Sequence, residues 1–200
     1  MLGYHGCDRE VGEAILAGEN PINTSGNEFD WLGKGAYFWE NDPDRAKSWA
    51  LLIKQSPGHF RHRVRVKDPF VIGAIIDLGN CLDLTETGAL ELLKEAHSEM
   101  AMTFEESGVP LPKNEEGYQG DVDLVKRHLD CAVINFLHAS REDRRVEGDG
   151  FLPFDTVRAA FWEGRPVFPG SRIMDKTHVQ LCVRDPRKSI FGYFRPPGGK

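Results

Sequence analysis

Apolar and polar positions at the start of the chain alternate between strand-like runs and helical spacing. Residues 2–6 are typical of a short strand, and Asp8 is placed to cap a helix that ends at Gly18. Residues 19–30 are rich in Asn, Gly, Pro and Ser, which predicts a loop. The aromatic run 37–39 follows, so we expect this loop to lead into a second short strand.

A second helix and a long apolar strand come next. The pair Asp42-Pro43 is typical of a helix start, and apolar residues recur at helical spacing between 46 and 53, until Pro57-Gly58. From Arg61 to Leu78 the chain alternates and then becomes continuously apolar over 70–76. Such a run is expected of a strand buried on at least one face, and we place it at the centre of the sheet.

The second half begins with helical periodicity and returns to strand signals. We expect helices over 84–104 and 121–138, a Pro- and Gly-containing loop over 108–120, and strands over 179–183 and 189–194. The segment 154–161 fits either type of element, and residues 196–200 resemble an unstructured tail. The pattern predicts an α/β or α+β protein, folded as a single domain over 1–200 with a helical insertion at about 85–140.

Composition excludes several classes of protein. The chain is 40% hydrophobic and 28% charged, as is ordinary for one globular domain, and it has no apolar run of eighteen residues. No secretory signal is readable either, so we expect no membrane contact and a cytoplasmic location. The formal net charge of -6 gives no global attraction to nucleic acid, although the alternating basic edge Arg61–Lys67 is either a solvated strand face or a local phosphate contact.

Common catalytic signatures are absent from the sequence. There is no G-x-G-x-x-G, no P-loop, no G-x-S-x-G and no H-E-x-x-H, and the seven histidines lack metal-ligand spacing. We therefore expect no metal site. The four cysteines are far apart without a C-x-x-C pair, which predicts buried reduced thiols: Cys7, Cys81, Cys131 and Cys182.

Five short motifs occur in a fixed order along the chain. They are Tyr4-His5-Gly6, then G-K-G-x-Y-F over 33–38, D-L-G-N-x-L-D-L over 77–84, F-D-T-V over 154–157 and Q-L-C-V-R-D over 180–185. This series resembles the catalytic domain of the poly(ADP-ribose) polymerases and, more distantly, diphtheria toxin. The matched segments cover about half of the chain. The resemblance implies an ADP-ribosyltransferase fold, an α+β architecture with split mixed or antiparallel sheets and flanking helices, and NAD as co-substrate.

The resemblance also implies roles for individual residues. His5 would donate a hydrogen bond to a ribose hydroxyl of NAD, and the main chain of Gly6 would pair with the nicotinamide amide. Tyr37 would stack on the nicotinamide ring, with Trp49 as the opposite wall if the preceding loop is one residue longer than usual. Taken singly, each of these residues could instead be structural, because histidines in strands and buried aromatic rings are common in protein cores.

Gln180 is the one position where the sequence leaves the family pattern. The aligned strand usually begins with a glutamate that stabilises the positively charged, oxocarbenium-like ribose. A neutral amide keeps the hydrogen bond but loses an ion attraction on the order of 4 kcal/mol at about 4 Å and an effective dielectric near 20. Gln180 is therefore expected to orient the ribose, and Glu40 would compensate for the missing charge if it faced the same pocket.

These residues together predict an NAD-dependent mono-ADP-ribosyltransferase. His5, Tyr37 and Gln180 are the expected catalytic residues, and the acceptor is a macromolecule, either protein or nucleic acid. The family's acceptor-recognition loop corresponds to residues 163–176. The size of the chain would suit a bacterial toxin, effector or phage-defence protein, by analogy of fold alone. Two alternatives remain open, namely a non-catalytic module that binds NAD or ADP-ribose and an NAD glycohydrolase.

Overall fold

The computed structural model describes residues 1–55, 65–147 and 151–197, and its elements alternate irregularly between helices and strands. The expected helix end at Pro57-Gly58, most of the basic edge Arg61–Lys67 and the end of the tail lie outside these residues. In chain order the elements are β1 (Leu2–Asp8), α1 (Arg9–Leu16), β2 (Ala36–Glu40), α2 (Pro43–Gln55), β3 (Pro69–Ile76), β4 (Cys81–Asp83), α3 (Thr87–Ser107), β5 (Asn114–Glu115), β6 (Lys126–Arg127), α4 (His128–Glu147), β7 (Thr156–Phe161), β8 (His178–Val183), α5 (Pro186–Ser189) and β9 (Ile190–Phe194).

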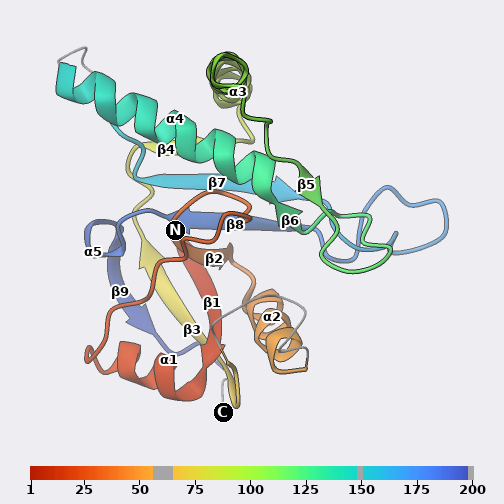
Figure 1. The fold of residues 1–200 in the computed structure, drawn as a ribbon. Coiled ribbons are helices and arrows are strands. Elements are labelled where there is room, and N and C mark those ends of the chain that lie inside the picture. The colour runs from red at the N-terminus through yellow and green to blue at the C-terminus, as the bar shows by residue number, and fades with distance from the viewer. Residues whose placement is uncertain (56–64, 148–150, 198–200) are drawn as a thin grey trace.

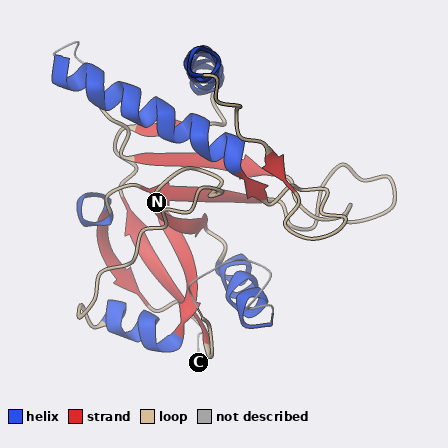
Figure 2. Ribbon diagram, in the orientation of Figure 1, coloured by secondary structure: helices blue, strands red, loops and turns tan. Residues whose placement is uncertain are grey.

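Seven strands form one mixed sheet in the order β4-β7-β8-β2-β1-β3-β9, and β5 pairs with β6 separately. Only β4 and β7 run parallel among the neighbours in the large sheet. Figures 1 and 2 show β7 and β8 crossing the view while β1, β3 and β9 run steeply to them. The protein is therefore α+β, and the two halves of its sheet are joined through β1 and β2 instead of being separate sheets.

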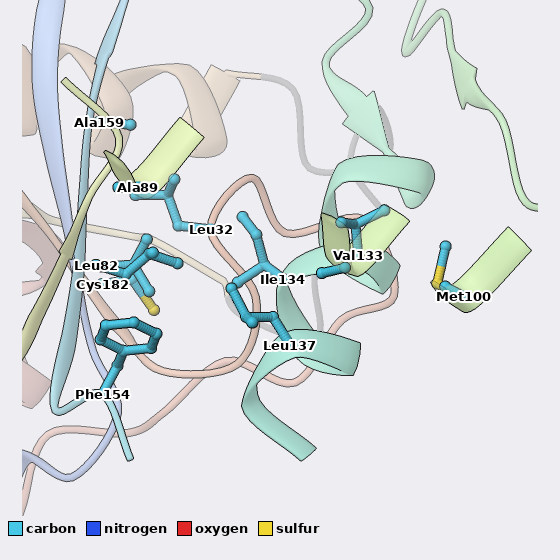
Figure 3. Close-up of a cluster of buried hydrophobic side chains, with 12 residues drawn as sticks. Leu32, Leu82, Ala89, Met100, Val133, Ile134, Leu137, Phe154, Ala159 and Cys182 are labelled. Carbon is cyan, nitrogen blue, oxygen red and sulfur yellow. The ribbon is translucent and has the colours of Figure 1, made fainter. Parts of the chain in front are cut away.

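Helices cover both faces of this sheet. On one face, α3 and α4 pack over β4, β7 and β8 around buried residues that include Leu82, Ile134 and Cys182 (Figures 1 and 3). On the same face, α2 packs over β1 and β2 through Ala46. On the opposite face, α1 packs through Ile15 against a second apolar cluster. The one sheet face thus carries α2 over one half and α3 with α4 over the other.

Local sequence explains where the first helix begins and where the chain turns. The Asp8 carboxylate accepts a hydrogen bond from the Glu10 N–H at 3.2 Å, as expected for the capping residue of α1. Gly18 follows the helix with φ of 74°, a left-handed conformation that favours glycine. The ambiguous segment 154–161 proves to contain β7. The strand at the start of the chain and the helix after Asp8 were expected from the sequence, with small shifts at their ends, whereas the segment 154–161 had fitted either type of element.

Two expectations about the elements were wrong. The apolar strand β3 is not central, because only β9 lies beyond it in the sheet; its long apolar run reflects burial under α1 on one face and α2 on the other. The helix expected over 121–138 begins instead at His128 and extends to Glu147. The buried Asp121 carboxylate accepts hydrogen bonds from the N–H groups of Gly117, Asp123 and Val125, which holds the preceding segment in a turn.

The core also contains a buried ionisable side chain, His138. His138 is only 4% exposed, and its ring lies 6.1 Å from that of Phe154. Neither of its nitrogens has a hydrogen-bond partner in the part of the chain that the structure describes. Burial, together with the nearby Arg184 and Arg141, lowers the pKa of His138 to about 3. The imidazole is therefore neutral in the folded protein near pH 7 and must be charged in the unfolded chain below its ordinary pKa of 6.5.

We expect His138 to make the protein acid-sensitive. Since the folded state binds fewer protons than the unfolded state between pH 6.5 and pH 3, this residue weakens the fold progressively as the pH falls through that window. At pH 4.5 the loss of stability is about 3 kcal/mol relative to pH 7, because that pH lies two units below the unfolded-state pKa of 6.5. Urea unfolding of the wild-type protein and of His138→Leu at pH 7 and pH 4.5 measures this loss of stability. An equal loss of stability in both proteins would contradict this assignment.

Candidate active site

The joint between the two halves of the sheet is short. Strand β1 pairs with β3 along seven residues, whereas its pairing with β2 covers only Gly3 with Glu40 and Tyr4 with Trp39. In this register the next pairs would be His5 with Phe38 and then Gly6 with Tyr37, and neither bridge forms among the described residues. The strands therefore separate at the position where the family resemblance places NAD.

The main chain of Gly6 is directed toward this opening. Met1 and Ile76 exchange backbone hydrogen bonds at 2.8 Å, so the odd-numbered residues of β1 bond to β3. The even-numbered residues face β2, as the bond from Asn41 N–H to the Leu2 carbonyl confirms. It follows that the N–H and C=O groups of Gly6 point into the gap between β1 and β2.

A side-chain contact takes the place of the missing backbone pair. His5 Nδ1 lies 2.8 Å from the Tyr37 carbonyl oxygen. A carbonyl only accepts hydrogen bonds, so the proton of the neutral ring is on Nδ1 and Nε2 carries a lone pair. Burial lowers the pKa of His5, which favours this neutral form. His5 is thus prepared to accept a hydrogen bond from a ribose hydroxyl, and not to donate one as the sequence suggested.

The absence of a side chain at Gly6 has a structural cause. A Cβ on Gly6 would lie 2.1 Å from the carbonyl oxygen of Ala46, so glycine allows α2 to pack directly on β1. The family resemblance assigns the main chain of Gly6 to the nicotinamide amide, which a glycine without a Cβ would allow to approach closely. The structure shows that helix packing already requires it.

The two aromatic residues expected to enclose nicotinamide belong to different clusters. The Tyr37 hydroxyl donates to the Gly33 carbonyl at 2.6 Å and accepts from the Leu32 N–H at 2.9 Å, while its ring packs on the core beneath α3 and α4. Burial raises the pKa of Tyr37 well above its ordinary value. Trp49 projects from α2, and its ring centroid lies 5.9 Å from that of Trp39. Trp39 is therefore a further aromatic wall beside the opening.

Gln180 lies on β8 directly opposite Trp39 of β2. Residues paired across neighbouring strands share a sheet face, so the Gln180 side chain is on the face that α2 and α4 cover. Its Oε1 is buried and has no hydrogen-bond partner among the described residues. Glu40 follows Trp39 and thus projects from the opposite face, where it accepts from Arg158 Nε at 2.6 Å. The structure therefore gives no support to compensation of Gln180 by Glu40.

Further polar groups are buried beside Gln180. Glu163, just after β7, forms an ion pair with Arg45 Nη2 of α2 at 2.7 Å and lies 3.3 Å from His178 Nδ1. His178 is on the same strand face as Gln180, two residues earlier, and its Nδ1 donates to the Lys176 carbonyl at 2.8 Å. We call Trp39, Arg45, Glu163, His178 and Gln180 the polar–aromatic cluster.

This cluster contains an unusual concentration of unsatisfied polar atoms. Six buried side-chain nitrogen or oxygen atoms have no hydrogen-bond partner within the described ranges, and four of them belong to the cluster. A buried polar atom without a partner costs about 1–3 kcal/mol, so such atoms indicate a place where water or a ligand binds. Two of the four donate, and two are able to accept. They are Trp39 Nε1, Arg45 Nε, His178 Nε2 and Gln180 Oε1.

The structure brings together only part of the predicted site. One face of the sheet carries or adjoins Gly6, Trp49 and Gln180. The His5 ring lies on the opposite face, where its centroid is 5.7 Å from that of Phe38. It contacts the opening through its hydrogen bond to the Tyr37 carbonyl. No sequence motif indicated that Arg45, Glu163 and His178 lie beside Gln180. Alternation along β8 would have indicated His178, since it shares a face with Gln180. Nothing in the sequence pairs Arg45 with Glu163, which are 118 residues apart.

The remaining features concern metal ligands, cysteines, membrane spans and cavities in the described residues. No group of three or more His, Cys, Asp or Glu side chains in 1–55, 65–147 and 151–197 is arranged to hold a metal ion. All four cysteines are free, and no described helix is long and apolar enough to cross a membrane. A hollow of about 790 Å³ lies along α1 and the loop after it, from Glu10 to Asn23, and contains none of the predicted site residues.

Comparisons of the chain with models of protein families, with curated proteins and with solved structures find no match.

Proposed function

We propose that the protein is an NAD-dependent mono-ADP-ribosyltransferase that transfers ADP-ribose from NAD to a macromolecular acceptor. The observation that carries this proposal is the opening of the β1–β2 ladder at Gly6 and Tyr37, two positions that the sequence motifs independently assign to NAD. An opened ladder exposes main-chain donors and acceptors inside a sheet, and a carboxamide such as that of nicotinamide is complementary to such a pair.

The side chains around this opening supply the remaining chemistry. His5 Nε2 would accept a hydrogen bond from a ribose hydroxyl on one side of the gap. On the other side, Gln180 Oε1 would orient the ribose that is bonded to nicotinamide, next to the donor Trp39 Nε1. A ligand seated in the gap would contact both sides. The bond between the ribose carbon and the nicotinamide nitrogen would break as an acceptor atom attacks that carbon. The electron pair of this bond would leave with neutral nicotinamide, and the proton of the acceptor would pass to water.

Gln180 favours a second candidate, a module that binds NAD without consuming it. A neutral amide supplies no negative charge to the oxocarbenium-like ribose, so binding is less affected than catalysis. Release of nicotinamide separates the two functions. The third possibility, hydrolysis of NAD, differs from transfer in whether ADP-ribose ends up free or attached.

NAD is expected to raise the thermal midpoint of the wild-type protein and to do so much less for His5→Ala. A ligand that binds only the folded state stabilises it by about 2.7 kcal/mol at a hundredfold excess over Kd. Differential scanning fluorimetry with millimolar NAD measures this shift. His97→Ala is the matched control, because His97 is exposed on α3. An unchanged midpoint for wild type would argue strongly against the NAD site.

A further inference from the structure

His178 is a buried histidine beside Gln180, and the chemistry described above gives it no role. Its side chain is 1% exposed, and it lies on β8 two residues before Gln180, on the same face of the sheet. Residues with this spacing are about 7 Å apart along a strand. The His178 ring centroid also lies 6.5 Å from that of Trp39, which is paired with Gln180. His178 is therefore part of the same site.

Hydrogen bonds determine which nitrogen of His178 is free. Nδ1 lies 2.8 Å from the Lys176 carbonyl oxygen and 3.3 Å from Glu163 Oε2, and both oxygens accept hydrogen bonds. The proton of the neutral ring is therefore on Nδ1, and Nε2 carries a lone pair. Nε2 is buried and has no hydrogen-bond partner within residues 1–55, 65–147 and 151–197. A carboxylate at one ring nitrogen and a free lone pair at the other form the arrangement of a general base.

Glu163 is held beside His178 by a second partner. Arg45 Nη2, in the first turn of α2, donates to the same carboxylate oxygen, Oε2, at 2.7 Å. The Arg45 and Glu163 side chains are only 18% and 9% exposed, so solvent screens this ion pair weakly. The carboxylate orients the imidazole and stabilises the imidazolium that forms when Nε2 takes up a proton. Glu163 is thus a positioning residue for His178.

Charged groups from several elements act on His178. Burial lowers its pKa, the charges of Glu163 and Asp42 raise it, and the charge of Arg45 lowers it. Arg127 lies over two aromatic rings that pack against His178. The net effect is a pKa below the ordinary value of 6.5. The neutral form, which accepts a proton, therefore predominates at pH 7.

A base of this kind favours one class of acceptor group. A hydroxyl is a weak nucleophile near pH 7 and gains most from losing its proton. A carboxylate is already ionised and needs no base, whereas a guanidinium, with a pKa above about 12, does not give its proton to an imidazole. Arg45 Nε is another buried atom of the cluster without a partner in the described ranges, and its charge disfavours a cationic acceptor. The cluster therefore fits a hydroxyl.

The surrounding charges favour a hydroxyl of a protein over that of a nucleic acid. Glu163 and Asp42 act on His178, and Asp123 Oδ2 accepts a hydrogen bond from the Gly164 N–H at 3.2 Å, next to Glu163. The whole chain has a formal net charge of -6. Such a surface gives no electrostatic attraction to a phosphate backbone. Serine and threonine side chains bring a hydroxyl without that charge.

We propose that His178 is the catalytic base of the transfer reaction, that Glu163 positions it, and that the acceptor is a serine or threonine hydroxyl of a protein. This assignment rests on the proposed function. The hydroxyl oxygen would bond to the ribose carbon as its proton moves to His178 Nε2, directly or through one water. The bond from that carbon to the nicotinamide nitrogen would break, and its electron pair would leave with nicotinamide. The imidazolium would then pass the proton to water.

His178→Asn tests the base, because the asparagine amide is able to replace the Nδ1 donor but has no group that takes up a proton. Each purified variant is incubated with a cell extract and NAD labelled in the ADP-ribose portion. We expect labelled protein to form roughly 10²- to 10³-fold more slowly. The Kd of NAD should stay within about twofold, since the proton moves after NAD has bound. His97→Asn, the same change at an exposed residue of α3, should match wild type in both measurements.

The pH dependence of transfer distinguishes a base from a structural residue. Wild-type transfer should fall about tenfold per pH unit below the pKa of His178, because the base is then protonated. His178→Asn should lack this decrease. Glu163→Gln should move it to lower pH, since the Glu163 charge raises the pKa of His178. Unfolding caused by His138 affects all of these proteins alike, and unfolding curves at each pH correct for it.

Several results would overturn the proposal. They are transfer by His178→Asn at the wild-type rate, an equal loss in His97→Asn, and label that nuclease or neutral hydroxylamine removes. Hydroxylamine cleaves an ester to a carboxylate acceptor but not the acetal that a hydroxyl forms. If His178→Asn does not fold, Glu163→Gln decides, and an unmoved acid decrease contradicts the assignment. A wild-type protein that releases no nicotinamide would instead overturn the proposed function, and this assignment with it.

Discussion

Gln180→Ala is expected to lower ADP-ribosyl transfer by roughly 10²- to 10³-fold, the usual effect of removing one preorganised contact to a transition state. The fold should tolerate this change, because Gln180 Oε1 is buried without a hydrogen-bond partner among the described residues, so its removal breaks no hydrogen bond of that atom. Transfer rates and urea unfolding, measured on the same preparation, separate catalysis from stability.

Two further variants make the Gln180 experiment specific. Val179→Ala changes the same strand on its opposite face and should leave transfer within about twofold. Gln180→Glu adds a carboxylate where positive charge develops and should raise NAD turnover, mainly as hydrolysis. If Gln180→Ala transfers ADP-ribose as fast as wild type while His5→Ala is inactive, Gln180 is not the residue that replaces the family's glutamate.

Gly6→Ala should destabilise the protein by roughly 3 kcal/mol, the upper end of the usual cost of inserting a methyl group into a packed core. The new Cβ would lie 2.1 Å from the Ala46 carbonyl oxygen, so α2 would have to move away from β1. The same movement would displace Arg45 and Trp49 and weaken NAD binding. Chemical unfolding measures the loss of stability.

Gly192→Ala is the control for Gly6→Ala, because no heavy atom lies within 4 Å of a Cβ built at that strand position. It should change the free energy of unfolding by less than about 0.5 kcal/mol. Equal stability of Gly6→Ala and wild type would show that α2 does not depend on this glycine.

Local patterns predicted most of the elements, because capping and periodicity are encoded by near neighbours in the sequence. Asp8 begins α1 as expected, and the apolar run of β3 is a strand. Sheet order is a long-range property, and it was misjudged: β3 is apolar on both faces because α1 and α2 cover it, not because it is central. The start of α4 was missed because the buried Asp121 holds residues 117–125 in a turn.

The candidate site was predictable where a single motif contains its residues. The motifs identified His5, Gly6 and Tyr37, and the structure places them at the opening between β1 and β2. They did not identify the proton position on His5, which depends on a carbonyl 32 residues away. They also could not reveal the ion pair of Arg45 with Glu163, since it forms only when α2 packs beside the end of β7.

The most direct test of the proposed function is the release of nicotinamide from NAD by the purified protein in the presence of a cell extract. The experiment follows NAD labelled separately in its nicotinamide and ADP-ribose portions. The proposed function predicts free nicotinamide together with ADP-ribose attached to a macromolecule, and neither product with His5→Ala. Recovery of intact NAD from the wild-type reaction, under conditions where NAD saturates the protein, would contradict it.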